Sequence, residues 1–241
     1  MKKQNNEDEQ KYSKEHCHKL LIKKVSSKIY QLFISEFTSL DHELDDIINK
    51  ISSADENDQI EIHISSTGGF IFDLFKMENI IHQYFYGRAK TILNSYGYSA
   101  GALLFLTGDE RIIYENSELM FHNLKTGYYG KLKDIDRHLA HEKKHWENYI
   151  RRSLKPYFTK QEIEELLLGK EFWLDATEIC QRGICTGVSI FGTVMSPDLY
   201  VDYSRNKKSK DELIRQLKNV KDNLSKKDRD FIDSVSTKNP D

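Results

Sequence analysis

The sequence predicts an α/β protein with a mainly parallel sheet. Segments rich in β-branched and aromatic residues alternate along the chain with segments whose apolar residues recur every three or four positions. Such alternation is typical of βαβ units, in which a helix crosses over between two parallel strands. The chain is 241 residues long, which is enough for one sizeable hydrophobic core flanked by tails.

The first half of the chain supplies most of this alternation. Strands are predicted at residues 28–35, 59–65, 89–97, 111–115 and 118–123. Helices are predicted at 38–54, with Thr38 or Ser39 as the N-cap, at 70–86, and from Ser99 onward. The 70–86 segment is apolar almost all round, so we expect that helix to be well buried.

The second half predicts one long helix and several short elements. Residues 131–154 form a charged helix with one apolar stripe, made of Leu132, Ile135, Leu139, Trp146, Tyr149, Ile150 and Leu154. Shorter elements follow: a helix at 160–169, an extended segment at 171–175, a helix at 176–183 and a strand at 184–190.

Composition divides the chain into three parts. Residues 1–25 are polar and predict an N-terminal arm, residues 26–192 carry the periodic elements, and residues 193–241 form a charged extension. Within that extension, a modest amphipathic helix is marked by Leu213, Leu217, Val220 and Leu224.

Charge and cysteine usage argue against several functional classes. The net charge is −2, which gives no electrostatic preference for nucleic acid or for a membrane surface. Cys17, Cys180 and Cys185 show no Cys-x-x-Cys spacing, so neither a disulfide framework nor a zinc site is expected. The N-terminus has no apolar signal core, and no run approaches the ~18 apolar residues of a membrane span. We therefore expect a cytoplasmic protein.

Two groups of histidines invite a metal hypothesis. His16 and His18 flank Cys17, and a second group on the long helix is made of His138, His141 and His145. The first group has no matching second cluster, and the second lacks a His-Glu-x-x-His motif. A solvated role is favoured for both, and no metal or other cofactor is expected.

The pattern Gly97-x-Ser99-x-Gly101 raises the question of a nucleophile. A serine at this spacing can lie on a strand-to-helix elbow, but a serine before a helix is also an ordinary N-cap. In α/β-hydrolases an acid and then a late histidine follow the serine, whereas here no histidine follows His145. An α/β-hydrolase is therefore disfavoured.

A different triad order, serine then histidine then acid, fits the sequence. His122 closes the apolar strand "ELMFH", and Gly68 and Gly69 lie between a strand and a helix, where backbone N–H groups can face an anion. Taken alone, His122 reads as an ordinary histidine and the glycine pair as a tight turn. Together with Ser99, in this order, they indicate acyl-transfer chemistry.

Four separated blocks resemble the proteolytic subunit of the Clp protease family: "IEIHISSTGGFIFDLFKMENII", "TILNSYGYSAGALLFLTGDERIIYENSELMFHN", "TGYYGKLKDID" and "FWLDATEICQRGI". The resemblance covers roughly residues 28–190, agrees in order and spacing, and does not extend to the tails. It implies the ClpP/crotonase-like fold, a repeated β-β-α superhelix with a handle helix.

The resemblance implies a role for each site residue. Ser99 would be the nucleophile, His122 the general base and Glu171 the acid that orients it. The N–H groups of Ala100 and of the glycine pair, Gly69 rather than Gly68, would stabilise the oxyanion.

Asp175 is the rival acid, although it reads more simply as a helix N-cap with Glu178 completing a capping box.

Other departures from the family pattern are Thr67 in place of proline, Tyr98 in place of a small residue, and Thr186 in place of aspartate. The proline's absence predicts a softer turn, and Tyr98 predicts a crowded cleft.

The resemblance also implies an assembly. Subunits would form stacked homo-oligomeric rings that enclose a chamber, joined through "GYYGK" as a strand and the helix from Lys131. Unfolded polypeptides would be the substrate, delivered by an ATP-dependent unfoldase, since this chain has no Walker loop. Three alternatives stay open: a viral capsid-maturation protease of the same fold, a non-catalytic ring component and, ranked last, a crotonase-type acyl-CoA enzyme.

Overall fold

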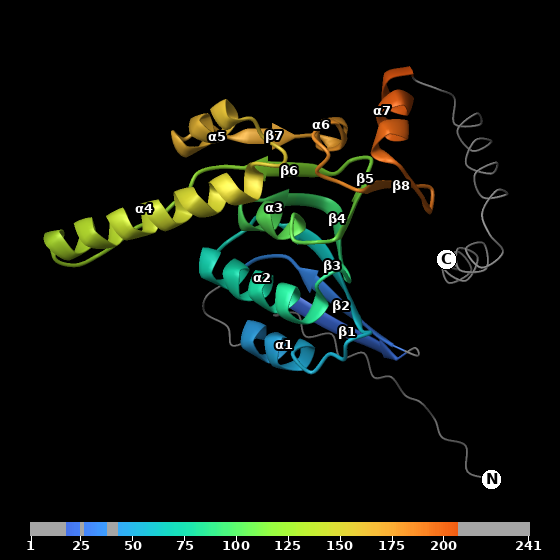
Figure 1. The fold of residues 1–241 in the computed structure, drawn as a ribbon, viewed down its shortest axis with the longest axis horizontal. Helices are drawn as coiled ribbons and strands as arrows, with labels where there is room; N and C mark the ends of the chain where they lie inside the picture. The colour runs from blue at the N-terminus through green and yellow to red at the C-terminus, as the bar shows by residue number, and fades with distance from the viewer. Residues whose placement is uncertain (1–17, 25–26, 38–42, 207–241) are drawn as a thin grey trace, which may run out of the picture.

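The structure is a computed structural model that describes residues 18–24, 27–37 and 43–206. In this part of the chain nine strands form one sheet, accompanied by seven helices (Figure 1). The main strand order is β1-β2-β3-β4-β5-β8-β9, with β6 paired to β4 and β7 paired to β6. The predicted α/β class is therefore confirmed, while the repeated superhelix and the handle stay predictions.

The strands occupy nine segments: β1 His18–Lys24, β2 Lys28–Ile34, β3 Gln59–Ser66, β4 Ala89–Tyr98, β5 Glu110–Tyr114, β6 Glu118–Phe121, β7 Phe172–Leu174, β8 Gly187–Ile190 and β9 Thr193–Met195. The helices are α1 Glu43–Ile51, α2 Ile71–Phe85, α3 Ala100–Phe105, α4 Leu132–Leu154, α5 Lys160–Leu167, α6 Ala176–Gln181 and α7 Pro197–Asn206. Apart from the "GYYGK" segment, every helix and strand predicted between residues 28 and 190 has a counterpart among them.

The centre of the sheet is parallel, as the βαβ alternation predicts. β2, β3, β4, β5 and β8 pair in parallel, whereas β1, β7 and β9 add antiparallel rims. On β3, Ile60, Ile62 and Ile64 are all fully buried on one face. This alternation fixes the register of β3, because a slip of one residue would expose all three isoleucines.

α2 differs from the prediction that it is buried all round. Leu74, Met77 and Phe85 are completely buried, but Phe72 on the opposite face is 60% exposed. The helix is therefore amphipathic, with one face packed on the body and aromatic residues on the other. The apolar composition of α2 alone could not show which of its faces packs on the rest of the described structure and which stays exposed.

Three elements were missed in the sequence: β1, β9 and α7. β1 lies inside the predicted N-terminal arm and pairs along its whole length with β2. α7 lies inside the predicted charged extension, yet its Tyr200 and Val201 are buried in the core. The predicted caps Thr38 and Ser39, the amphipathic helix from Leu213, and His16 and Cys17 of the first histidine group lie outside the described residues, whereas His18 is the first residue of β1.

α4 carries the predicted apolar stripe, but only its second half is packed. Trp146, Tyr149, Ile150 and Leu154 are buried, while Leu132 and Leu139 are exposed on the half that projects from the body (Figure 1). The preceding "GYYGK" segment, residues 127–131, is not a strand in the single chain. None of the described helices is both long enough and apolar enough to cross a membrane.

Candidate active site

Ser99 lies on a strained turn between β4 and α3. Its φ is 55° and its ψ is −122°, a positive φ that non-glycine residues adopt rarely. Its N–H donates to the Met120 carbonyl at 2.9 Å, which ties the turn to β6. Although Ser99 occupies the N-cap position of α3, its side chain makes no capping hydrogen bond. The hydroxyl is thus not used as an ordinary helix cap.

The two glycines beside Ser99 allow close packing of its platform. A Cβ on Gly101 would lie 2.9 Å from the Cβ of Ser66, and one on Gly97 would lie 3.0 Å from Leu93 Cδ1. Every residue of α3 is buried. The Gly-x-Ser-x-Gly spacing therefore reflects a helix pressed against β3 and β4, with the serine at its start.

Gly68 and Gly69 bring a second backbone segment against Ser99. Their φ values are 105° and 132°, and a Cβ on Gly68 would lie 2.7 Å from the Cβ of Ser99. The Gly68 N–H donates to Ser66 Oγ at 3.1 Å. Gly69, in contrast, lines the cavity in front of Ser99 together with Ala100. This difference favours the Gly69 and Ala100 N–H groups as the donors to an anion.

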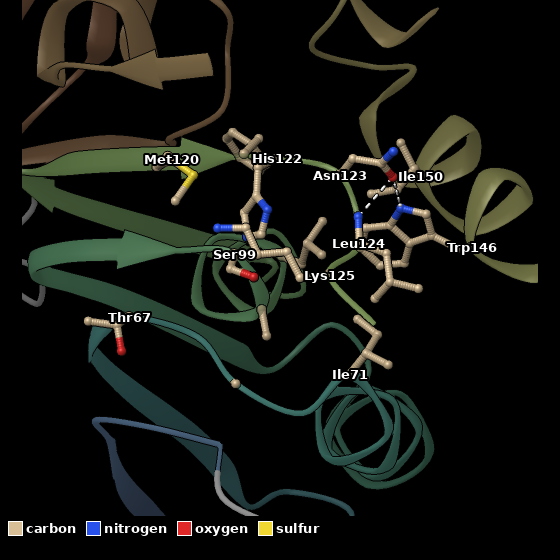
Figure 2. A pocket seen from close by; sticks show the side chains of 14 residues that line it. Thr67, Ile71, Ser99, Met120, His122, Asn123, Leu124, Lys125, Trp146 and Ile150 are labelled. Carbon is tan, nitrogen blue, oxygen red and sulfur yellow. Dashed lines mark hydrogen bonds between the residues drawn. The ribbon is translucent and has the colours of Figure 1, made fainter. Parts of the chain in front are cut away.

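Ser99 and His122 line the same cavity, which has a volume of about 290 Å³ (Figure 2). Its walls are mostly apolar and come from α2, α3, α4, β6 and the segment after β6: Ile71, Leu103, Met120, Phe121, Leu124, Trp146 and Ile150. The polar groups around it belong to Thr67, Ser99, His122, Asn123 and Lys125. An apolar pocket beside a serine and a histidine is suited to holding one substrate side chain.

His122 follows the last residue of β6 and is half-buried. Burial lowers the pKa of His122, and the positive charge of Lys125 lowers it further. The charge of Glu171 and a hydrogen bond with the Asn123 backbone raise the same pKa. On balance the imidazole is biased towards its neutral form, which is the form a general base requires.

The pairing of β6 with β7 brings Glu171 towards His122. The antiparallel register pairs Met120 with Trp173 and Phe121 with Phe172. Continued one step beyond the two strands, the same register would set Glu171 opposite His122, and directly opposed residues share one face of a sheet. Glu171 does not line the cavity, is exposed, and its Oε2 accepts a hydrogen bond from Trp173 Nε1 at 3.2 Å.

Asp175 has a different role, which the sequence also predicted. Its side chain accepts the Glu178 N–H at 2.9 Å, and the Glu178 side chain accepts the Asp175 N–H at 3.1 Å. This is a complete capping box at the start of α6. Because the Asp175 carboxylate is occupied at the helix end, Glu171 is the better candidate for the acid.

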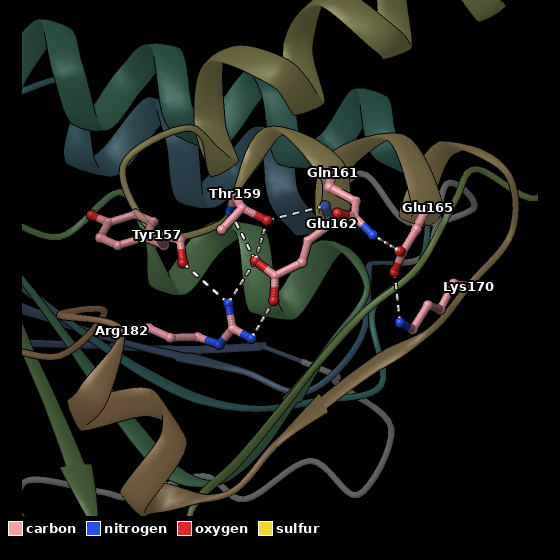
Figure 3. A network of polar contacts seen from close by, with 7 residues as sticks. All are labelled: Tyr157, Thr159, Gln161, Glu162, Glu165, Lys170 and Arg182. Carbon is pink, nitrogen blue, oxygen red and sulfur yellow. Dashed lines mark hydrogen bonds and ion pairs between the residues drawn. The ribbon is translucent and has the colours of Figure 1, made fainter.

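A polar network fixes the segment that leads to Glu171 (Figure 3). Arg182 Nη2 donates to Glu162 Oε1 at 2.7 Å, and Glu162 also completes the capping box of α5 with Thr159. The hydrogen bond from Arg182 is the main cause that lowers the pKa of Glu162 to about 2. Lys170, beside Glu171, donates to Glu165 at 2.6 Å. α5 is thereby held to the chain on both sides of β7: to Lys170 just before the strand and to Arg182 in the turn after α6.

Asn123 was missed in the sequence. Its Oδ1 accepts the Trp146 Nε1–H at 2.9 Å, and its Nδ2 donates to the Leu167 carbonyl at 2.7 Å. One amide thus joins the cavity wall to α4, as Figure 2 shows, and also to the end of α5. Its position directly after the candidate base was the only sequence signal that could have found it.

Tyr98 and Thr67, two residues that differ from the family pattern, lie in different places relative to the cavity. Tyr98 does not line the cavity, because its hydroxyl donates to Glu118 at 2.5 Å and its ring packs against Trp173. The predicted crowding of the cleft by Tyr98 is therefore wrong. Thr67 lies at the edge of the cavity, with its hydroxyl 3.5 Å from Glu36 Oε1.

Within the described residues, no three His, Cys, Asp or Glu side chains are grouped so that they could hold a metal.

Comparison with known proteins identifies the family. The family model described as Clp protease matches residues 14–190. A search of curated proteins finds no match. The matched range contains Ser99, His122 and Glu171 and begins before β1, so the family domain includes a strand that the sequence had assigned to the polar arm. Because this range spans most of the chain, the protein belongs to the Clp protease family, and it is a peptidase of the ClpP type.

Proposed function

We propose that this protein is a serine endopeptidase of the Clp type, with Ser99 as nucleophile, His122 as general base and Glu171 as the acid that orients His122. The observation that carries the proposal is the cavity shared by Ser99 and His122, with Ser99 held at a positive φ. A serine on such a turn presents its hydroxyl to the cavity while α3 anchors its backbone.

The reaction would proceed through an acyl-enzyme. The Ser99 Oγ attacks the peptide carbonyl carbon while the His122 imidazole takes the hydroxyl proton. The negative charge that forms on the carbonyl oxygen is stabilised by the N–H groups of Gly69 and Ala100. The imidazolium then returns its proton to the leaving amine. Water, deprotonated by the same imidazole, releases the acyl group and restores Ser99.

Assembly into stacked homo-oligomeric rings is part of the proposal. The exposed Leu132 and Leu139 on the projecting half of α4 need a cover that the described part of the chain does not provide. In such rings the cavity would face an enclosed chamber, and the substrate would be unfolded polypeptide in the cytoplasm. An ATP-dependent unfoldase would deliver it. The peptidase domain would span residues 26–192, together with β1 and α7 from the flanking segments.

A serine-directed phosphonate probe tests the nucleophile. We expect the native protein to be labelled and to cleave unstructured peptides, and the Ser99→Ala variant to lose both activities while keeping the native particle mass. Ser95→Ala is the matched control, because Ser95 is an exposed serine of β4, the strand that ends just before Ser99. Equal labelling of Ser99→Ala and the native protein would overturn the assignment.

One observation favours a second candidate, a non-catalytic ring component. The Glu171 carboxylate is exposed and is engaged by Trp173, so the triad would be weakly oriented in the isolated chain. Measured turnover of a fluorogenic peptide by the purified protein would exclude this candidate.

A further inference from the structure

Lys125 is an unexpected residue in the cavity. Of the fourteen residues that line it, Lys125 is the only one with a permanently charged side chain, and most of the others are apolar. In Figure 2 its side chain lies beside Ser99 and His122. Its charge also acts on the imidazole, because Lys125 is one of the causes that lower the pKa of His122.

Among the residues that the structure describes, no fixed anion faces the ammonium group of Lys125. In the described part of the chain no carboxylate forms an ion pair with it. Glu171, the acid whose charge acts on His122, lies outside the cavity and accepts a hydrogen bond from Trp173 instead. An unpaired cation at an apolar cavity attracts an anionic group of whatever occupies that cavity.

The shape of the cavity suggests which anion fits. Its apolar walls, which include Leu103, Leu124 and Ile150, can cover a short hydrocarbon stem. Lys125 can meet a carboxylate at the end of such a stem. A glutamate side chain has this combination, with two methylene groups followed by a carboxylate.

Resting on the serine peptidase function proposed above, we propose that Lys125 selects substrates with glutamate as the residue whose carbonyl is attacked by Ser99. The oxyanion itself is assigned to the Gly69 and Ala100 N–H groups. The charge of Lys125 therefore serves side-chain recognition. If Lys125 instead stabilised the oxyanion, its removal would slow the cleavage of acidic and neutral peptides equally.

Peptide pairs that differ by one charge test this inference. Two fluorogenic peptides carry Glu or the isosteric Gln immediately before the fluorophore, and kcat/KM is measured for each. We expect the native protein to favour Glu about fivefold, an effect that shrinks as salt is added. Lys125→Gln should bring the ratio close to one, and Lys125→Glu should invert it. Lys155→Gln, which removes an exposed lysine away from the cavity, should keep the native ratio.

A binding measurement separates this inference from the proposed function. Fluorescently labelled Glu and Gln peptides are titrated into Ser99→Ala protein, alone and combined with Lys125→Gln or Lys125→Glu. The same preference and the same inversion should appear in the dissociation constants, even if the native protein is not labelled by the phosphonate probe. A Glu-to-Gln ratio that stays the same in all three backgrounds, in turnover or in binding, would overturn the role of Lys125.

Discussion

Ser99 and Glu171, the two proposed partners of His122, are held in place by different means. Ser99 is fixed by backbone: a strained turn, a fully buried helix and a glycine pair that leaves no room for a Cβ. Glu171 is an exposed side chain at the end of a three-residue strand, oriented by one hydrogen bond from Trp173. The proposed nucleophile is therefore preorganised in the single chain, whereas the proposed acid is free to change its partner.

This difference suggests where control of activity can act. A side-chain hydrogen bond on the surface contributes little stability and is easily exchanged, while a packed backbone turn is not. Any event that turns the Glu171 carboxylate from Trp173 towards His122 would complete the triad without moving Ser99. Four perturbations test the contrast.

The largest effect is expected from Gly68→Ala. The new Cβ would lie 2.7 Å from the Cβ of Ser99 and 2.9 Å from the Tyr98 carbonyl oxygen. Since both neighbours belong to the turn that holds Ser99, the turn must shift, and we expect probe labelling to fall by about a hundredfold or more. Rates of phosphonate labelling measure this effect.

Gly169→Ala is the matched control for backbone strain. Its φ of 106° is nearly the same as that of Gly68, at 105°, but no atom lies within 4 Å of its added Cβ. We expect a stability loss of about 1–2 kcal/mol from strain alone and less than a tenfold change in labelling. Similar labelling rates for the two variants would show that the turn around Ser99 is softer than its packing indicates.

The second effect is a pH dependence of the stability of the fold, and it comes from the partly buried carboxyl of Glu78 on α2. The hydroxyl of Tyr149 on α4 donates to Glu78 on α2 at 2.5 Å, and burial raises the pKa of Glu78 to about 7. Between the ordinary pKa of 4.5 and 7, the folded chain therefore holds a proton that the unfolded chain has lost. Stability should fall across this window as pH rises, by about 1.4 kcal/mol per unit and roughly 3 kcal/mol in total.

Glu78→Gln removes this titration while keeping an acceptor for Tyr149. Urea unfolding at pH 5 and at pH 8 should show the variant gaining stability relative to the native protein at the higher pH. A difference between the two proteins that does not change with pH would mean that Glu78 is already ionised in the folded state.

The third test compares the two carboxylates near the site. Glu171→Gln should lower kcat/KM about ten- to a hundredfold, because the imidazole loses its orienting charge. Asp175→Ala should cost about 1 kcal/mol of stability through the lost cap of α6, with smaller effects on turnover. Peptide cleavage and thermal unfolding measure the two quantities separately. The reverse pattern would make Asp175 the acid.

The smallest effect is a displacement of the pH–rate profile. The charge of Lys125 lowers the pKa of His122, and that of Glu171 raises it. Since the neutral imidazole is the active form, Lys125→Gln should move the acidic limb of kcat/KM to higher pH, and Glu171→Gln should move it to lower pH. Displacement in the same direction for both variants would exclude a direct charge effect on His122.

The Ser99 half of the site could be predicted from sequence because its determinants are local. Gly97, Ser99 and Gly101 lie within five residues, and the short strand that ends before His122 was visible in its composition. The position of Glu171 depends on the register of β6 against β7, a pairing of residues about fifty positions apart that no local pattern encodes. For the same reason the family resemblance was needed to name Glu171, and the link that Asn123 makes to α4 and α5 was not foreseen.

The elements at the edges of the molecule could not be predicted for a related reason. α7 is mostly polar, and only its packing in the folded chain shows that Tyr200 and Val201 belong to the core. The "GYYGK" segment was predicted as a strand, but the described chain offers it no partner strand. A strand is stable only when it pairs with another strand. The sequence of this segment therefore does not decide whether it becomes a strand in an assembly.

The chain has two tryptophans. One lies in the wall of the cavity beside Ser99, and the other is hydrogen-bonded to Glu171. Trp146 is buried in the cavity wall, while Trp173 is 51% exposed and donates its indole N–H to Glu171. Intrinsic fluorescence is consequently a built-in reporter of both sides. A ligand that fills the cavity should change the emission of Trp146, and a turn of Glu171 should change that of Trp173. With Trp173→Phe as the reference, occupancy and acid movement could be followed in real time without a label.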